Sequence, residues 1–431
     1  MTGAGMTGGG PTPPTRALTP EQVARRRAVE ALRSGVPSWD AVAALGSGQT
    51  KAEDRYSSLL DVAEGGAARG LLFGAGFGAG KSHLLTHLAH LALERGFAVS
   101  TVVVSKETPL HDPAKVYRAA IESLVGPGRT PGLLADVAAS LDPDSTRYTE
   151  LARWLHAPSR PVDERFAATL LLHEKLRGGE VPDGDEVVDA VVRFWSGDPI
   201  RVPDLRRALK AVGEGGVYDF GTVPARELAR QRLRFTARLL RAAGHAGWVI
   251  LFDEVELIGR YSLLQRGRSY AELARWLGGD PDDPTLPVAA VLAMTDDFEG
   301  YVLRDRDDRT KVPAKLRGKQ SSEWSELAGL AEKGIRSIER EMLLLEPPDP
   351  TELDRAYATV KALHGAAFDW SPPDVPGLER LGNTRMRQYV RAWINAWDLV
   401  RLDPDYAPDT EVVELASSYA EDEALESDRS G

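Results

Sequence analysis

The stretch Leu71–Ser82, which reads Leu-Leu-Phe-Gly-Ala-Gly-Phe-Gly-Ala-Gly-Lys-Ser, constrains the fold of this chain most strongly. Leu71–Phe73 is typical of the end of a buried strand, and an apolar helix is expected from Ser82 to Glu94. Glycines let successive backbone N–H groups turn towards one phosphate, and the start of a helix adds partial positive charge. The stretch therefore predicts a phosphate-binding loop between a strand and a helix.

The residues of this loop have predicted parts in binding ATP and Mg²⁺. Lys81 is expected to reach the β- and γ-phosphates, and the Ser82 hydroxyl is expected to ligate Mg²⁺. In the pattern G-x-x-x-x-G-K-[ST] the first glycine would fall at position 75, which is Ala75 here. A glycine-rich turn that happens to precede Lys-Ser is the alternative, but the fit of strand, loop and helix favours nucleotide binding. The predicted nucleotide-binding residues are Gly76, Phe77, Gly78, Ala79, Gly80, Lys81, Ser82 and His83.

An acidic motif follows another predicted strand much later in the chain. The apolar run Trp248–Phe252 ends directly before Asp253 and Glu254. Asp253 is expected to join Ser82 in the Mg²⁺ shell, and Glu254 is expected to polarise the attacking water as a catalytic base. Many strands end in acidic residues, so the motif indicates little alone. Paired with a phosphate-binding loop in one chain, it indicates an ATPase.

Two further strands complete a predicted sheet. Residues 287–293 form one, and the polar Thr295 beyond its end is a candidate sensor of the γ-phosphate, with an ordinary strand-end cap as the alternative. Residues 342–345 form the last strand. Together with the strands at 71–73 and 98–105, these predict an α/β fold, a P-loop NTPase of the ASCE type with a doubly wound parallel sheet.

The rest of the chain divides by composition and by helix and turn signals. We expect a disordered leader at 1–18, an ATPase core at 19–346 with an N-terminal helical segment at 19–70 and a helical insertion at 125–221, a helical lid at 347–405 and an acidic tail at 406–431. The tail holds eight acidic residues against Arg429 and is typical of a solvated segment. The loop Gly46–Gln49 either packs beside the adenine or is a plain connector.

Composition limits the function classes. The net charge of −11 argues against a globally basic nucleic-acid binder, although residues 201–241 hold ten Lys and Arg against four Asp and Glu. DNA is therefore a candidate partner that charge alone does not decide. The absence of cysteine fits a cytoplasmic protein. The sequence has no apolar run of about 18 residues and no signal-peptide pattern at its N-terminus, so no membrane partner is expected.

The order of these motifs resembles the AAA+ superfamily. A polar residue after the fourth strand and a helical lid after the fifth are features of that superfamily. The resemblance implies that Arg385, in Gly382-Asn-Thr-Arg385, is a second sensor that contacts the γ-phosphate, with a surface arginine as the alternative. It also makes Arg336 and Arg340 candidates for an arginine finger acting between subunits of a homo-oligomer, although a solvated helix face explains them equally well.

A narrower resemblance is to the BREX-system ATP-binding protein family, BrxD-type. It is carried by four stretches: Arg25–Pro37, Ala44–Gln49, Phe77–His83 and Val104–Leu110. The resemblance extends over about residues 20–400. It implies a part in restricting phage together with a DNA methyltransferase, a helicase and a phosphatase-like protein.

Two functions from different classes follow. The first is an ATPase that uses hydrolysis to remodel or move DNA or a DNA-bound defence complex. The second is a nucleotide-gated switch or scaffold that binds ATP and assembles with partners but turns over little. Glu254 favours the first, because a chain that only holds ATP needs no carboxylate to activate water. A small-molecule phosphotransferase would need an acceptor pocket, which the sequence does not reveal.

Overall fold

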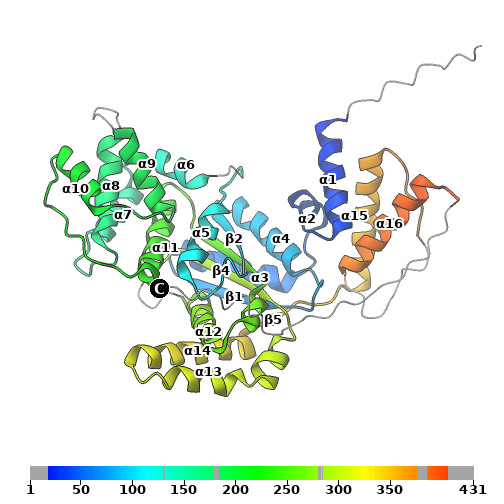
Figure 1. Ribbon diagram of the computed structural model, residues 1–431. Helices are drawn as coiled ribbons and strands as arrows, with labels where there is room; N and C mark the ends of the chain where they lie inside the picture. Colours follow the sequence, from blue (N-terminus) through cyan, green and yellow to red (C-terminus); the bar gives the residue numbers. More distant parts are fainter. Residues whose placement is uncertain are drawn as a thin grey trace, which may run out of the picture. The chain divides into compact units, whose positions relative to one another are not determined.

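A five-stranded sheet forms the centre of the larger part of the molecule (Figure 1). The computed structural model describes residues 18–129, 132–177, 184–279, 283, 285–375 and 386–405. The strands run parallel in the order β2-β3-β4-β1-β5. Their bounds are β1 Arg69–Gly74, β2 Ala98–Val103, β3 Trp248–Asp253, β4 Val288–Met294 and β5 Leu343–Leu344. The predicted α/β class and parallel sheet are confirmed.

Helices cover both faces of the sheet, which is why its strands read as continuous apolar runs. Two of them, α3 (Thr50–Glu64) and α4 (Lys81–Glu94), contact one face. The other face forms a continuous core with α5 (Pro113–Glu122), α11 (Ala225–Ala242) and α12 (Leu263–Gly278). Every residue of β4 is buried, so this strand lies at the centre of both layers.

Helices follow α5 where the sequence predicts a helical insertion. They are α6 (Leu133–Ser140), α7 (Thr146–Leu155), α8 (Glu164–Leu176), α9 (Gly184–Trp195) and α10 (Val202–Ala211). Phe166 and Trp195 pack against Phe235 of α11, with ring centroids 5.1 and 5.4 Å away. The Tyr117 hydroxyl of α5 hydrogen-bonds the Thr236 hydroxyl at 2.7 Å. These contacts join the insertion to the core through α5 and α11.

A helical layer lies between β3 and β5 along the chain. It contains η1 (Val255–Arg260), η2 (Glu299–Asp305), α13 (Asp308–Arg317) and α14 (Ser322–Glu341). The fully buried carboxylate of Asp308 accepts bonds from Arg266 at 2.8 and 3.0 Å and from the Tyr270 hydroxyl at 2.7 Å. Because this buried charge is paired and hydrogen-bonded, it fixes the start of α13 against α12.

A smaller unit combines the two ends of the described chain. It contains α1 (Pro20–Ser34), α2 (Trp39–Leu45), α15 (Pro350–Phe368) and α16 (Met386–Leu402). Val29 of α1 shares a core with Val360 and Trp397. The sequence analysis assigned the first two helices to the ATPase core and the last two to a lid, whereas the structure packs all four together. Apolar faces more than 300 residues apart complement each other here, which local patterns do not reveal.

The closest helix packing, between α12 and α14, gives a test of this fold. A Cβ at Gly334 would lie 2.0 Å from the Tyr270 carbonyl oxygen, whereas one at Gly329 of the same helix would meet nothing within 4 Å. Gly334→Ala is expected to destabilise the protein by about 1–3 kcal/mol. Gly329→Ala is expected to stabilise it by about 0.5–1 kcal/mol. Thermal unfolding followed by circular dichroism measures both, and equal effects would contradict the packing.

Candidate functional site

The loop between β1 and α4 has the backbone that glycine permits. Gly78 and Gly80 have φ values of 77° and 100°, a region that other residues rarely adopt. The Ala75 N–H donates to the Met294 carbonyl at 3.2 Å, which continues the pairing of β1 with β4 into the loop. The Leu84 N–H donates to the Gly80 carbonyl at 2.8 Å and closes the first turn of α4. The strand, loop and helix thus follow one another as the sequence predicts.

Lys81 lies inside this loop. Its side chain is 9% exposed, and its ammonium group donates to the carbonyl oxygens of Ala75 at 3.0 Å and Gly76 at 3.3 Å. A buried ammonium held only by loop carbonyls carries a positive charge that no adjacent carboxylate hydrogen-bonds. The loop therefore holds one cation at the position where a phosphate would lie against the helix start.

The loop Gly46–Gln49 lies beside the first turn of α4. The imidazole Nε2 of His83 lies 2.6 Å from the Gly46 carbonyl oxygen, so Nε2 must carry the hydrogen. Burial lowers the pKa of His83, which favours this neutral tautomer. The Gln49 amide exchanges two hydrogen bonds with the Glu346 backbone, at 2.9 and 3.1 Å. The segment is thereby fixed between α4 and the residues after β5.

The acidic motif lies at the same edge of the sheet as the phosphate-binding loop. Since β4 separates β3 from β1, the ends of those two strands are about 10 Å apart. Asp253 ends β3, and its carboxylate accepts the Glu254 N–H at 2.9 Å. Glu254 has a left-handed backbone, with φ at 57°, which is uncommon outside glycine. This turn exposes the Glu254 side chain at the carboxyl end of the strand.

The charges of these residues influence one another. Burial is the largest cause that raises the pKa of Glu254, the negative charge of Asp253 adds to it, and the positive charge of Lys81 opposes both. Lys81 has the same opposing effect on Glu256. One cation thus faces carboxylates that end a strand two positions away in the sheet. Such shifted carboxylates in contact with a loop cation are typical of catalytic sites.

Glu256 is a residue of this site to which the sequence analysis gave no role. It lies on η1, and its Oε2 atom is buried and has no hydrogen-bond partner among the described residues. Burial raises the pKa of Glu256 to about 7, against the opposing charge of Lys81. The only signal in the sequence is a second acidic residue in Asp253-Glu-Val-Glu256. Its burial depends on how η1 turns back under the strand end.

The remaining predicted site residues differ in how they lie. Thr295 is 1% exposed and follows β4, the strand between the phosphate-binding loop and the acidic motif. Phe77 is 42% exposed at the tip of the loop. Arg336 and Arg340 are exposed on α14. Arg385 lies outside the described residues.

The oxygen atoms at this edge fit magnesium. Mg²⁺ prefers a few carboxylate or hydroxyl ligands and keeps phosphate and water oxygens in its other positions. Ser82 opens α4 and Asp253 ends β3, so both lie at the carboxyl edge of the sheet. Within the described ranges there is no group of three or more His, Cys, Asp or Glu side chains that could hold a metal alone. A metal here would depend on the nucleotide for further ligands.

Comparison with known proteins identifies part of the chain. Residues 21–139 match a family model described as BREX system ATP-binding protein BrxC/D. The predicted resemblance to this BREX family is confirmed over that range. The match contains the phosphate-binding loop, whereas Asp253, Glu256 and Thr295 lie beyond it. No curated protein and no solved structure gives a significant match. No helix within the described residues is long and apolar enough to cross a membrane.

The buried carboxyl group of Glu256 makes stability depend on pH. Between its ordinary pKa near 4.5 and its folded value of about 7, the folded chain keeps a proton that the unfolded chain releases. Stability is therefore lost as pH rises through this window, at a cost on the order of 3 kcal/mol. Glu256→Gln is neutral at every pH, so it is expected to raise the unfolding temperature by several degrees at pH 8 and hardly at pH 5.

Differential scanning fluorimetry without nucleotide measures this shift. Glu341→Gln removes the same charge from an exposed position of α14 and controls for net charge. An equal effect of Glu256→Gln at both pH values would contradict the buried, proton-holding carboxyl group.

Proposed function

We propose that this protein hydrolyses ATP and uses the energy to remodel or move DNA or a DNA-bound complex of a BREX phage-defence system. The family match supports ATP binding in such a system. The observation that carries the further step to hydrolysis is the mutual influence of Lys81, Glu254 and Glu256 at one edge of the sheet. A loop cation beside shifted carboxylates provides both phosphate binding and activation of water.

Each residue has a part in this proposal. Lys81 leaves the loop carbonyls and binds the β- and γ-phosphates, and the glycine backbone of the loop surrounds them. Ser82 and Asp253 hold Mg²⁺, which neutralises charge on the phosphates. Glu254 accepts a proton from the attacking water. Thr295 lies on the strand between these groups and senses the γ-phosphate, a role that AAA+ resemblance also assigns to Arg385.

The second candidate is a nucleotide-gated switch or scaffold with little turnover. The burial of Glu256 favours this alternative in one respect. A carboxyl group whose pKa is about 7 is partly protonated at neutral pH and is then a poor base. The ATPase therefore depends on Glu254, which is exposed at the strand end and able to approach a water molecule.

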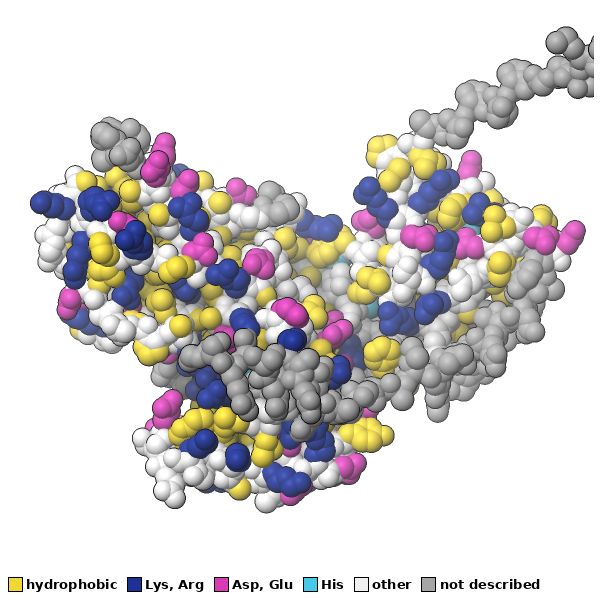
Figure 2. Space-filling model, viewed as in Figure 1, with side chains coloured by type: hydrophobic (Ala, Val, Ile, Leu, Met, Phe, Trp, Pro, Cys, Tyr) yellow, Lys and Arg dark blue, Asp and Glu magenta, His cyan; other side chains and the backbone are white. Residues whose placement is uncertain are grey.

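DNA contact, partners and assembly belong to the proposal. Arg232 and Arg234 of α11 are buried, so part of the basic run at 201–241 serves the interior. Figure 2 shows Lys and Arg side chains over α8 and α10, with acidic side chains between them. This mixed surface favours contact through a defence complex over a continuous DNA track. The methyltransferase, helicase and phosphatase-like protein are the partners we propose, with Arg336 or Arg340 acting between subunits of a homo-oligomer.

ATP binding depends on Lys81. Lys81→Ala removes the buried cation of the loop and is expected to abolish ATP binding, whereas Ser82→Ala mainly weakens its Mg²⁺-dependent part. Isothermal titration calorimetry with and without Mg²⁺ measures both. Lys51→Ala removes a lysine whose side chain is 84% exposed and is the matched control. Lys81→Ala that binds ATP as tightly as the parent would contradict the site.

Hydrolysis depends on Glu254. Glu254→Gln keeps the shape of the side chain but removes its basicity, so turnover is expected to fall by about 10²–10⁴ while ATP stays bound. Release of phosphate, measured with and without duplex DNA, gives the rates. Glu256→Gln makes the same change two residues away. If it stops turnover while Glu254→Gln does not, Glu256 is the base. If the parent shows no turnover even with DNA and its partners, the switch is the function.

A further inference from the structure

An apolar groove with a basic rim lies on the sheet face opposite α4. Its floor includes Val288 and Ala290 of β4, and its walls include Leu233 of α11 and Trp276 of α12. The cavity volume is about 70 Å³, which is room for one or two aliphatic side chains. Leu233 and Trp276 are only partly buried, so the groove is open to solvent. It lies apart from the phosphate-binding loop and has no part in the proposed ATPase.

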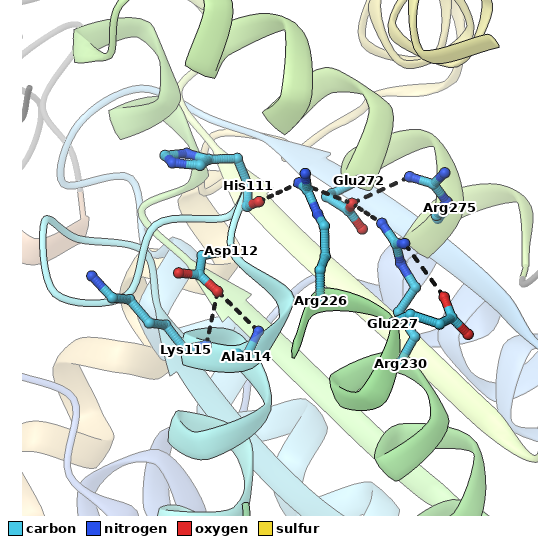
Figure 3. Close-up of polar contacts among 9 residues, drawn as sticks. All are labelled: His111, Asp112, Ala114, Lys115, Arg226, Glu227, Arg230, Glu272 and Arg275. Atoms are coloured by element: carbon cyan, nitrogen blue, oxygen red, sulfur yellow. Dashed lines mark hydrogen bonds and ion pairs between the residues drawn. The ribbon is translucent and has the colours of Figure 1, made fainter. Parts of the chain in front are cut away.

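Three arginines at the rim share a single carboxylate (Figure 3). Glu272 Oε1 lies 2.6 Å from Arg230, 3.2 Å from Arg275 and 3.6 Å from Arg226. Glu227 adds one weak contact, 3.8 Å from Arg230. Together with Arg69, which also lines the groove, four guanidinium groups face two carboxylates. The rim therefore carries an excess of positive charge.

Neighbouring groups respond to this excess. Burial and then the charge of Arg226 lower the pKa of His111 to about 4, and Arg268 and Lys115 add to the effect against Asp112. Burial also lowers the pKa of Arg226, as do the charges of Arg230, Arg268 and Arg275, whereas Glu272 opposes them. Positive groups held this close in a partly buried place are stabilised by further negative charge. The groove thus suits an apolar chain that carries carboxylates.

The chain itself contains such a segment. Residues 406–431 follow the described part and hold eight Asp and Glu against one Arg, with the run Glu411-Val-Val-Glu-Leu415 near their start. Two carboxylates there flank aliphatic side chains of a size that fits the cavity. Twenty-six residues span up to about 90 Å when extended, so chain length does not limit where the segment reaches. Opposite charge and matching apolar size both point to the same segment.

We propose that the acidic segment 406–431 binds in the groove between α11 and α12 of its own chain, with Val412, Val413 and Leu415 against the apolar floor and Glu411 and Glu414 on the arginines. Binding within one chain raises the effective concentration of the segment to the millimolar range. An acidic partner must then displace the segment before it can bind the same arginines. The groove becomes a regulated docking surface that is separate from the ATP site.

The test uses the full chain and a fluorescent peptide of residues 406–425. Val412→Ser, Val413→Ser and Leu415→Ser together weaken the chain's own segment and leave the described residues unchanged. The labelled peptide is expected to bind this triple variant at least tenfold more tightly than the parent, because the parent's own segment competes. Fluorescence anisotropy gives both affinities. Peptide with Glu411→Lys and Glu414→Lys is expected to bind the triple variant at least tenfold more weakly than the parent peptide.

A groove variant completes the design. Arg230→Gln, added to the triple variant, is expected to weaken peptide binding about tenfold, whereas Arg207→Gln, at a side chain that is 79% exposed on α10, leaves it unchanged. Equal binding to the parent and the triple variant would overturn the proposal, as would indifference to the peptide's charges. Duplex DNA that binds the groove arginines while the peptide does not would equally overturn it.

Discussion

The pairing of β1 with β4 and of β4 with β3 fixes everything else about the proposed site. Parallel strands end at the same edge, so Gly74, Met294 and Asp253 lie side by side at the start of three different loops. This register brings a buried lysine and carboxylates from residues about 170 positions apart close enough to shift one another's pKa. A change that slipped either pairing by one residue would turn the motifs to opposite faces.

Much of this arrangement could be predicted from the sequence, because its signals are local. Glycines before Lys81 require a turn with positive φ, and apolar runs without alternation require strands buried on both faces. The position of Asp253 at a strand end follows from the same kind of run. The structure bears out the five strands and their parallel order, and the family match bears out the resemblance over residues 21–139.

What the sequence could not provide depends on contacts between distant residues. Glu256 looks like an ordinary surface glutamate until η1 buries it and leaves one oxygen without a partner. The four-helix unit joins α1 and α2 to α15 and α16 through a core that periodicity does not assign. The arginines of α11 suggested a basic surface, yet Arg232 donates to the carbonyl oxygens of Phe194 and Asp198, inside the insertion. Helical spacing gives the face of a residue but not its partner.

Hydrogen–deuterium exchange with and without a non-hydrolysable ATP analogue and Mg²⁺ tests the central claim most directly, which is that one nucleotide site joins the loop at 74–84 to the strand end at 251–257. The account predicts that both segments gain protection together, with the loop 46–49 beside them, and that α9 and α10 of the insertion do not change. Protection of the loop alone, with 251–257 unaffected at saturating analogue, would contradict it.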